Sequence, residues 1–496
     1  MIATRTTPGL LVPLLALGTL ALGGPAAGAA PSDRLVVEAG RILTLAGPDI
    51  EDGVIVIEDG RITAIGKRGE VEAPWDAPVM GGPDYVAFPG FVEAITSRGI
   101  DRSNESIDVA PFLSLRDSVD PVNFYFEDCL RWGITTVNIQ HANNCVVGAR
   151  GMIVRPAGMT VAEMAVKPVH GMKIAAGPKS GKSSATQAQA LRLTFADLRR
   201  YLEELVQEKK DGLGHARREA LYQGRELEGE KAKGRAMSGE AWKVDGFELV
   251  PRGEVDEKQE PLLELVEGRY DVYMSCGTPQ QVHLGLEIAR DNGFLHRTAL
   301  VVSPSCWKVA DVIAEAGVPV ILTDLTATER DPITGEEQET FVPGVFRDKG
   351  VKFALTSQDP DSNSLWYRAA MATGMGLERA DALAAVTTVP AEILGLGDRV
   401  GSLEVGKDGN VVLFSGDPLS VTSWVEHVFI EGAHVYDRSE DTRNKHLLEA
   451  IEPRGTEPAA PEQPEDGSDD SEAGDDDDDG EDEDGDGDDG DEEDGE

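Results

Sequence analysis

The chain has 496 residues, with 46 Lys and Arg against 90 Asp and Glu and a formal net charge of −44. This length is enough for one large domain with a smaller partner domain. The acidic balance argues against nucleic acid and against an anionic membrane surface as partners. The four cysteines contain no Cys-x-x-Cys pair, which argues against a structural zinc site.

The first 30 residues have the order of charge, apolar core and small residues that is typical of a secretory signal peptide. Arg5 supplies the charge, residues 9–22 are largely apolar, and residues 26–30 are Ala and Gly. Pro13 and Gly18 interrupt the apolar stretch, which is short for a membrane span. We therefore expect cleavage near Ala30 and export to the periplasm or the extracellular space.

The next segment, residues 31–86, reads as short strands. Two apolar runs at 54–57 and 62–65 flank an Asp59-Gly60 pair, which is a strong signal for a two-residue hairpin. A second hairpin of this kind is predicted near the other end of the chain, where 428–430 and 433–436 flank Glu431-Gly432.

Between these β segments, short apolar strands alternate with helical stretches, which predicts a parallel α/β barrel. The strand candidates are 134–138, 271–275, 299–303, 318–323 and 352–356, and the helix candidates are 280–291, 307–316, 366–374 and 379–387. Residues 183–268 depart from this rhythm, because they are rich in Lys, Arg and Glu at helical spacing. We interpret them as a helical insertion in one barrel loop.

The end of the chain is strongly acidic. Residues 457–496 contain 24 acidic residues and no basic ones, and removing them leaves 66 acidic and 46 basic residues. A segment with so few apolar side chains cannot bury enough surface to fold, so we expect it to be disordered.

Two groups of residues at the ends of the predicted barrel resemble the amidohydrolase superfamily. Ala87-Phe88-Pro89-Gly90 is similar to the entry into that family's first barrel strand, and 382–395 is similar to its last barrel helix. Residues 399–411 resemble its return into a small β domain. Within the superfamily, 171–175 and 144–151 look most like the imidazolonepropionase-like branch.

This resemblance implies a (β/α)8 TIM barrel with a small β-sandwich made from both flanks. The domain boundaries we predict are a signal peptide at 1–30, the first part of the sandwich at 31–86, the barrel at 87–399 with its insertion at 183–268, the second part of the sandwich at 400–440, and a linker with the acidic tail at 441–496.

The resemblance also implies hydrolysis of non-peptide C–N bonds with one or two divalent metal ions, but the histidines for the metal are missing. In the register of the family's Pro-Gly-x-x-Asp-x-His-x-His motif, this chain has Glu93 in place of the aspartate and Ile95 and Ser97 in place of the two histidines. The segments 272–277 and 300–307, where further histidines are expected, contain none, and the aspartate that normally follows Ser357 directly arrives one place late, as Asp359.

Four remaining polar residues define a hypothetical remodelled site: His141, Lys173, Glu93 and Asp359. They could hold a single divalent ion such as zinc, with Asp359 in a catalytic role, since three nitrogen or oxygen ligands suffice for a catalytic metal. The other interpretation is that His141 and Lys173 have only structural partners.

Two further patterns allow alternative interpretations. Cys276 and Cys306 follow neighbouring predicted strands, so they form either a disulfide or two buried thiols. Residues 176–183 fit a relaxed phosphate-loop pattern, although a basic turn is the interpretation we favour because Pro178 removes one of the N–H groups that would bind phosphate.

The function we predict is that of an exported amidohydrolase-fold protein that is catalytically silent or divergent, needs no cofactor and binds a small-molecule ligand at the barrel mouth. The alternative is an active hydrolase of cyclic amides, ureides or dipeptide-like substrates with a remodelled zinc site. No membrane span is expected after the signal peptide, and assembly into a homo-oligomer stays open.

Overall fold

The computed structural model describes residues 34–222, 241–244, 247–357 and 364–451. It is a mixed α/β structure in which the described residues up to Thr442 belong to one compact unit. Among the described residues, no helix combines the length and the apolar character needed to cross a membrane.

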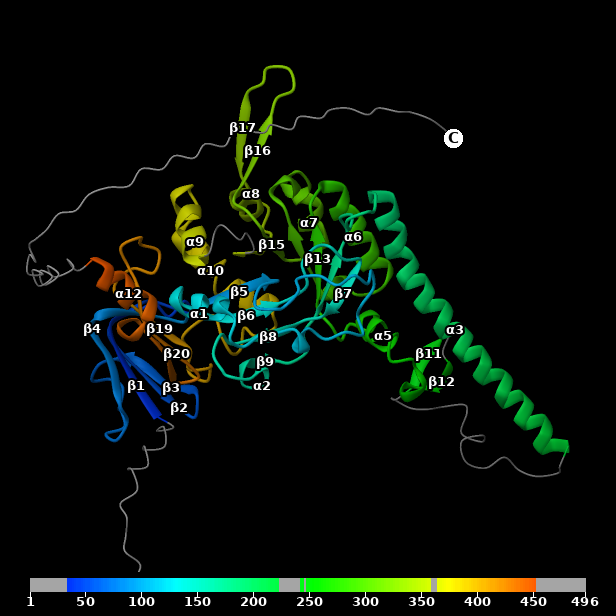
Figure 1. Ribbon diagram of the computed structural model, residues 1–496, viewed down its shortest axis with the longest axis horizontal. Helices are drawn as coiled ribbons and strands as arrows, with labels where there is room; N and C mark the ends of the chain where they lie inside the picture. Colours follow the sequence, from blue (N-terminus) through cyan, green and yellow to red (C-terminus); the bar gives the residue numbers. More distant parts are fainter. Residues whose placement is uncertain (1–33, 223–240, 245–246, 358–363, 452–496) are drawn as a thin grey trace, which may run out of the picture. The chain divides into compact units, whose positions relative to one another are not determined.

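A seven-stranded sheet unites the two flanks of the chain, and its strands lie together in blue and orange in Figure 1. The strand order is β21-β20-β19-β4-β1-β2-β3. Its members are β1 (Arg34–Ile42), β2 (Ile50–Glu58), β3 (Arg61–Lys67), β4 (Val79–Phe88), β19 (Val411–Phe414), β20 (Val425–Ile430) and β21 (Ala433–Asp437).

Both predicted hairpins are confirmed in this sheet as β2–β3 and β20–β21. Asp59 and Gly60 have φ values of 49° and 75°, and Glu431 and Gly432 have 47° and 76°. Positive φ at both central residues matches the right-handed twist of the strands, which explains why these two pairs close tight turns.

The barrel-type strands form two further sheets. The six-stranded sheet has the order β18-β15-β14-β13-β10-β7, and the four-stranded sheet has the order β5-β6-β8-β9. The first contains β7 (Val147–Arg150), β10 (Met172–Ala175), β13 (Val272–Cys276), β14 (Thr298–Val302), β15 (Val320–Leu322) and β18 (Phe353–Leu355); the second contains β5 (Phe91–Thr96), β6 (Ile134–Ile139), β8 (Met152–Val154) and β9 (Ala165–Lys167).

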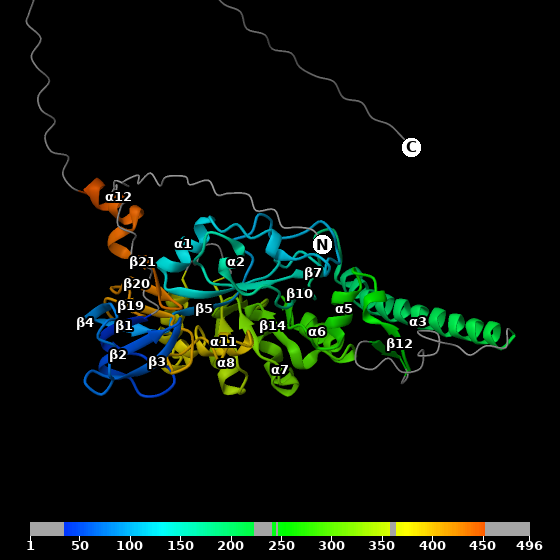
Figure 2. The same ribbon diagram turned by 90° about the horizontal axis from the view of Figure 1, so that it is seen from below.

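Helices alternate with these strands. Figure 2 shows α6, α7 and α8 along the strands of the six-stranded sheet. The α-helices are α1 (Phe124–Arg131), α2 (Val161–Met164), α3 (Ser184–Tyr222), α5 (Glu260–Val266), α6 (Pro279–Asp291), α7 (Ala310–Ala316), α8 (Val342–Asp348), α9 (Leu365–Gly374), α10 (Arg379–Ala384), α11 (Thr388–Ile393) and α12 (Thr442–Ile451). Short 3-10 helices are η1 (Leu115–Asp117), η2 (Arg252–Glu254), η3 (Leu295–Arg297), η4 (Pro304–Val309) and η5 (Arg438–Glu440).

The region predicted as a helical insertion contains more than helix. It begins with the 39-residue α3 and ends with α5, but between them lies the hairpin of β11 (Ala241–Val244) and β12 (Phe247–Pro251). A second hairpin, β16 (Thr326–Arg330) with β17 (Glu337–Phe341), interrupts the barrel rhythm before α8.

The predicted single closed barrel is not what the hydrogen bonds form, because the described strands divide into two sheets rather than one continuous ring. Side chains and single backbone contacts join the sheets instead. At one junction, the Gly151 N–H donates to the Gly171 carbonyl at 3.0 Å and the His170 N–H donates to the Gly151 carbonyl at 2.8 Å.

Glu93 makes the other junction, between β5 and the end of β18. Its buried carboxylate accepts from the Thr356 hydroxyl at 2.6 Å, from the Ser357 N–H at 3.1 Å and from the Ser357 hydroxyl. The Thr356 hydroxyl also lies 2.8 Å from the Ile95 carbonyl. Burial raises the pKa of Glu93, and the hydrogen bonds from Ser357 and Thr356 oppose that rise.

The geometry at this junction suits a neutral Glu93. The single Thr356 proton can serve either Glu93 or the Ile95 carbonyl. A protonated Glu93 can donate to the Thr356 oxygen while Thr356 donates to Ile95, and the amide of glutamine can do the same. Truncation to alanine would instead leave the Ser357 N–H buried without an acceptor.

We therefore expect Glu93→Ala to lower the free energy of unfolding by about 3 kcal/mol and Glu93→Gln to keep the fold. Because the pKa of Glu93 is raised in the folded state, its protonated form stabilises the protein below the unfolded-state pKa, and this contribution is lost as pH rises through the folded-state pKa. In urea unfolding from pH 4 to 7, the free energy of unfolding of Glu93→Gln should increase relative to that of the wild type as pH rises. Equal pH dependence of the two proteins would contradict this account.

Candidate functional site

Strand β10 and the carboxyl end of β6 place two of the predicted site residues, Lys173 and His141, in the protein interior. Lys173 lies within β10, and its pairing partner on β13 is Tyr273. Tyr273 belongs to the core cluster inside the two sheets, together with residues such as Val301 and Ile321. Because residues paired across strands share a face, Lys173 also points inward.

Lys173 is fully buried, and its Nζ atom has no hydrogen-bond partner among the described residues. Burial lowers the pKa of Lys173 to about 8. A buried ammonium group without an acceptor is costly, so this position is a strong candidate for binding an external acceptor.

His141 follows β6 and is 1% exposed. Its Nδ1 atom accepts the Ala149 N–H at 3.1 Å, while its Nε2 atom is buried without a partner. Burial lowers the pKa of His141, and the charge of Lys173 adds to this effect whereas Glu105 opposes it. In a neutral ring that accepts at Nδ1, the proton resides on Nε2, so His141 presents a second unmatched donor.

Glycines in the segment after β6 make room for these side chains. A Cβ atom on Gly148 would lie 2.8 Å from His141 Nδ1, and one on Gly151 would lie 2.2 Å from Gln140 Nε2. Gln140 donates to Asn138 and to the His170 carbonyl, which leaves its buried Oε1 atom as an unmatched acceptor. The sequence analysis missed Gln140, although its position directly before His141 was the available signal.

The four residues of the hypothetical metal site do not act together among the described residues. The hydrogen bonds to Thr356 and Ser357 engage the carboxylate of Glu93, and His141 directs a proton rather than a lone pair inward. Asp359, the predicted catalytic residue, lies outside the described residues. The described residues of this site therefore do not fit a catalytic divalent ion, and we derive no reaction step through one.

Hydrogen bonds join the segments that follow β13 and β14 to each other. The Ser303 and Ser305 hydroxyls donate to the Gly277 carbonyl at 2.7 and 3.1 Å. Cys276 and Met274 belong to the same hydrophobic core cluster, and the Cys276 Sγ atom is 3.4 Å from the Gln281 carbonyl. Cys306 instead contacts the Cys276 carbonyl at 3.4 Å.

The disulfide considered between Cys276 and Cys306 is not formed in the structure, because all four cysteines are free and buried. Both cysteines lie in the same core cluster, and each thiol contacts a carbonyl group: Cys276 that of Gln281, and Cys306 that of Cys276.

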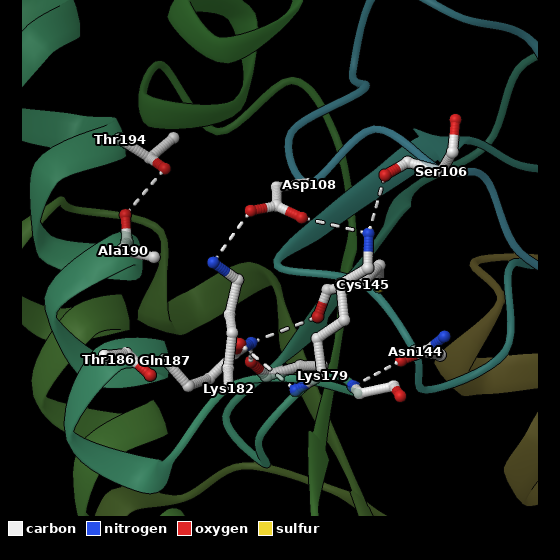
Figure 3. Close-up of polar contacts among 12 residues, drawn as sticks. Ser106, Asp108, Asn144, Cys145, Lys179, Lys182, Thr186, Gln187, Ala190 and Thr194 are labelled. Carbon is white, nitrogen blue, oxygen red and sulfur yellow. Dashed lines mark hydrogen bonds and ion pairs between the residues drawn. The ribbon is translucent and has the colours of Figure 1, made fainter. Parts of the chain in front are cut away.

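The loop after β10 carries the phosphate-loop pattern, and Figure 3 shows how its groups are used. Lys179 and Lys182 both pair with Asp108, at 2.9 and 2.8 Å. The Lys179 N–H donates to Gln187, and the Ser180 N–H donates to Asn144. Since acceptors of the protein itself already engage these cations and N–H groups, the structure supports the interpretation as a basic turn.

This loop also ties together segments that follow three different strands. Gln187 donates to the carbonyl groups of Cys145 and Ala175 at 3.0 and 2.7 Å, and Lys179 donates to the Ser106 carbonyl at 2.9 Å. The polar contacts fix the loops at the carboxyl ends of β5, β6 and β10 beside His141 and Lys173.

Comparison with known proteins agrees with this architecture. The model of the amidohydrolase family matches residues 266–435. The amidohydrolase tasK of Hapsidospora irregularis is 36% identical over 92 residues, which are 18% of this chain and 9% of that protein. The chain therefore matches about a tenth of the length of this curated relative.

The crystal structure of an amidohydrolase from Thermotoga maritima shares the fold, with a TM-score of 0.65, 24% identity and coverage of 82% of this chain and all of that one. The chain therefore has the fold of that amidohydrolase, and its residues 266–435 resemble the amidohydrolase family. A zinc-bound adenosine deaminase from Xanthomonas campestris also matches, with a TM-score of 0.47, 18% identity and coverage of 85% and 97% of the two chains. The imidazolonepropionase-like branch of the superfamily stays a prediction.

The buried position of Lys173 predicts a stability gain when its charge is removed. Burial depresses the folded-state pKa of Lys173 to about 8, so its neutral form is the one that the folded protein favours. Above the unfolded-state pKa, Lys173 therefore does not lower the free energy of unfolding, and its destabilising effect grows as pH falls towards 8. We expect Lys173→Met to raise the free energy of unfolding at pH 7 by about 3 kcal/mol and the gain to shrink towards pH 10.

Chemical denaturation at pH 7 and pH 10 measures this effect. Lys352→Met is the matched control, because 68% of the Lys352 side chain is exposed. A loss of stability in the Lys173 variant at pH 7 would show that its ammonium group has a partner within the folded protein.

The cysteines predict a second result. We expect thiol titration of the denatured, unreduced protein to find four reactive groups, since each thiol is buried without a bonded sulfur. Two missing thiols would support the disulfide between Cys276 and Cys306.

Proposed function

We propose that this protein is a catalytically silent member of the amidohydrolase superfamily that binds a small ligand beside His141 and Lys173. In this proposal, the two sheets together correspond to the superfamily's (β/α)8 barrel, and the ligand enters at the carboxyl ends of the strands. The proposal includes export from the cell, for which the order of residues 1–30 is the support.

The observation that carries the proposal is the pair of buried donors without acceptors. Lys173 Nζ and the Nε2 atom of His141 both lack partners among the described residues, and Lys173 is close enough to influence the pKa of His141. Buried donors are normally satisfied, so their pairing with a ligand oxygen accounts for both residues at once.

The chemistry of these groups suggests the class of ligand. Two donors suit a carboxylate or carbonyl oxygen, and the unmatched Oε1 atom of Gln140 suits an N–H group. Cyclic amides, ureides and dipeptide-like molecules combine a carbonyl oxygen with an N–H group. An anionic ligand would also raise the pKa of Lys173 and offset the cost of burying its charge.

The proposed lack of catalysis rests on how amidohydrolases activate water. Amide hydrolysis on this fold needs a metal-bound water of lowered pKa, and Ile95 and Ser97 stand where the histidines of the superfamily's motif are expected. Glu93, at the aspartate position of that motif, already makes hydrogen bonds that join β5 to β18.

Calorimetric screening of cyclic amides, ureides, dipeptides and simple carboxylates tests the proposal. We expect at least one class to bind, Lys173→Met to weaken its binding by about tenfold or more, and Lys352→Met to leave it unchanged. No hydrolysis should follow when Zn²⁺ is added. Equal binding by wild type and Lys173→Met would contradict the assignment of the site.

The alternative, an active C–N hydrolase with a remodelled zinc site, predicts a different outcome. It requires zinc-dependent turnover and about one retained metal equivalent, whereas a silent site should retain less than about a tenth of an equivalent. The metal assay is best carried out on the His434→Ala protein, because a separate pair of histidines lies on the seven-stranded sheet.

A further inference from the structure

The hairpin of β20 and β21 gathers a second group of metal-binding residue types, in the seven-stranded sheet. His427 lies on β20, and His434 and Asp437 lie on β21. One potential ligand atom from each of the three residues lies within 4.8 Å of the other two. The spacing of the two histidines in the sequence does not by itself link them to Asp437.

A β-bulge brings the three side chains to one face. Near the turn, Phe429 pairs with His434, but the register then shifts, so that Val428 pairs with Tyr436 and His427 with Asp437. In a regular strand, residues 434 and 437 would point to opposite faces, since side chains alternate. The extra residue, Val435, restores them to the same face, which is the effect expected of a bulge.

The distances between the ligand atoms suit a tetrahedral ion. His427 Nδ1 lies 3.2 Å from His434 Nε2 and 3.6 Å from Asp437 Oδ2. Zinc binds nitrogen and carboxylate oxygen at about 2.0–2.2 Å, so two ligands of a tetrahedral ion are separated by about 3.3–3.6 Å. The first two separations are close to this range, and the third pair, His434 and Asp437, also has ligand atoms within 4.8 Å of each other.

Neighbouring groups hold the three ligands in position. Asp437 Oδ1 accepts from the N–H and the hydroxyl of Ser439, at 2.8 and 2.6 Å, which leaves Oδ2 towards the imidazoles. The ring of His434 stacks on Phe429 with 4.9 Å between centroids, and His427 meets Tyr85 edge to face at 5.8 Å. Oriented ligands of this kind lose less freedom on binding a metal.

We propose that His427, His434 and Asp437 form a binding site for a divalent transition-metal ion, with zinc as the natural probe. Imidazole favours such ions, whereas Ca²⁺ and Mg²⁺ prefer all-oxygen sites. About 17% of the His427 side chain and 28% of the Asp437 side chain are exposed, so water can fill the fourth position. Because β21 is the last strand of the sheet order, a bound ion would join this edge strand to β20.

Zinc titration of the full chain in excess Ca²⁺ tests the site, because Ca²⁺ saturates the oxygen-rich acidic tail. We expect one zinc ion per chain in the wild type and about a tenfold or greater loss of affinity in His434→Ala and in Asp437→Asn. The asparagine variant retains an oxygen that can accept from Ser439, so it removes charge while keeping the turn. His283→Ala, on the exposed face of α6, is the control and should bind zinc as the wild type does.

Cobalt binding provides a readout that needs no variant. A tetrahedral site with two imidazoles should give visible Co²⁺ absorption bands that one equivalent of Zn²⁺ removes. Absence of these bands from the wild type, or equal zinc affinity in the wild type and His434→Ala, overturns the proposal. Neither result depends on whether a ligand binds beside Lys173.

Discussion

The carboxylate of Glu93 supports the arrangement on which the interior of this protein depends. It receives hydrogen bonds from Thr356 and Ser357 and so joins the four-stranded sheet to the six-stranded sheet, where no strand pairing does so. Glu93 stands at the aspartate position of the superfamily's first motif, and in this chain its side chain makes a structural contact. A group already satisfied by buried donors has little capacity left to bind an ion.

The interior presents buried donors that have no hydrogen-bond partner among the described residues. Lys173 and His141 are both buried, and burial together with the charge of Lys173 lowers the pKa of His141. Contacts of Asp108, Lys179 and Gln187 hold the loops beside them. Retaining a buried, unpaired ammonium group costs stability, which is typical of functional sites rather than of positions selected for packing. Binding of a ligand oxygen is the simplest reason to retain it.

The two candidate sites offer different kinds of binding groups and lie on different parts of the chain. The interior pair presents N–H donors, which suit a carbonyl or carboxylate group. The hairpin group presents imidazole lone pairs and one carboxylate oxygen, which suit a transition metal. The family resemblance predicted a metal at the barrel mouth, whereas the donor geometry favours one on the seven-stranded sheet.

The sequence by itself determined the two hairpins, many of the core strands and the resemblance to the amidohydrolases. Asp59-Gly60 and Glu431-Gly432 fixed both hairpins, and the strand candidates at 134–138 and 271–275 became β6 and β13 with shifts of a single residue. Local patterns suffice there, because turn conformation and apolar alternation are set by neighbouring residues. Only the tertiary structure decided which side chains meet. The hydrogen-bond partners of Glu93, Thr356 and Ser357, lie more than 260 residues away in the sequence. A single extra residue in β21 decides whether Asp437 faces His427.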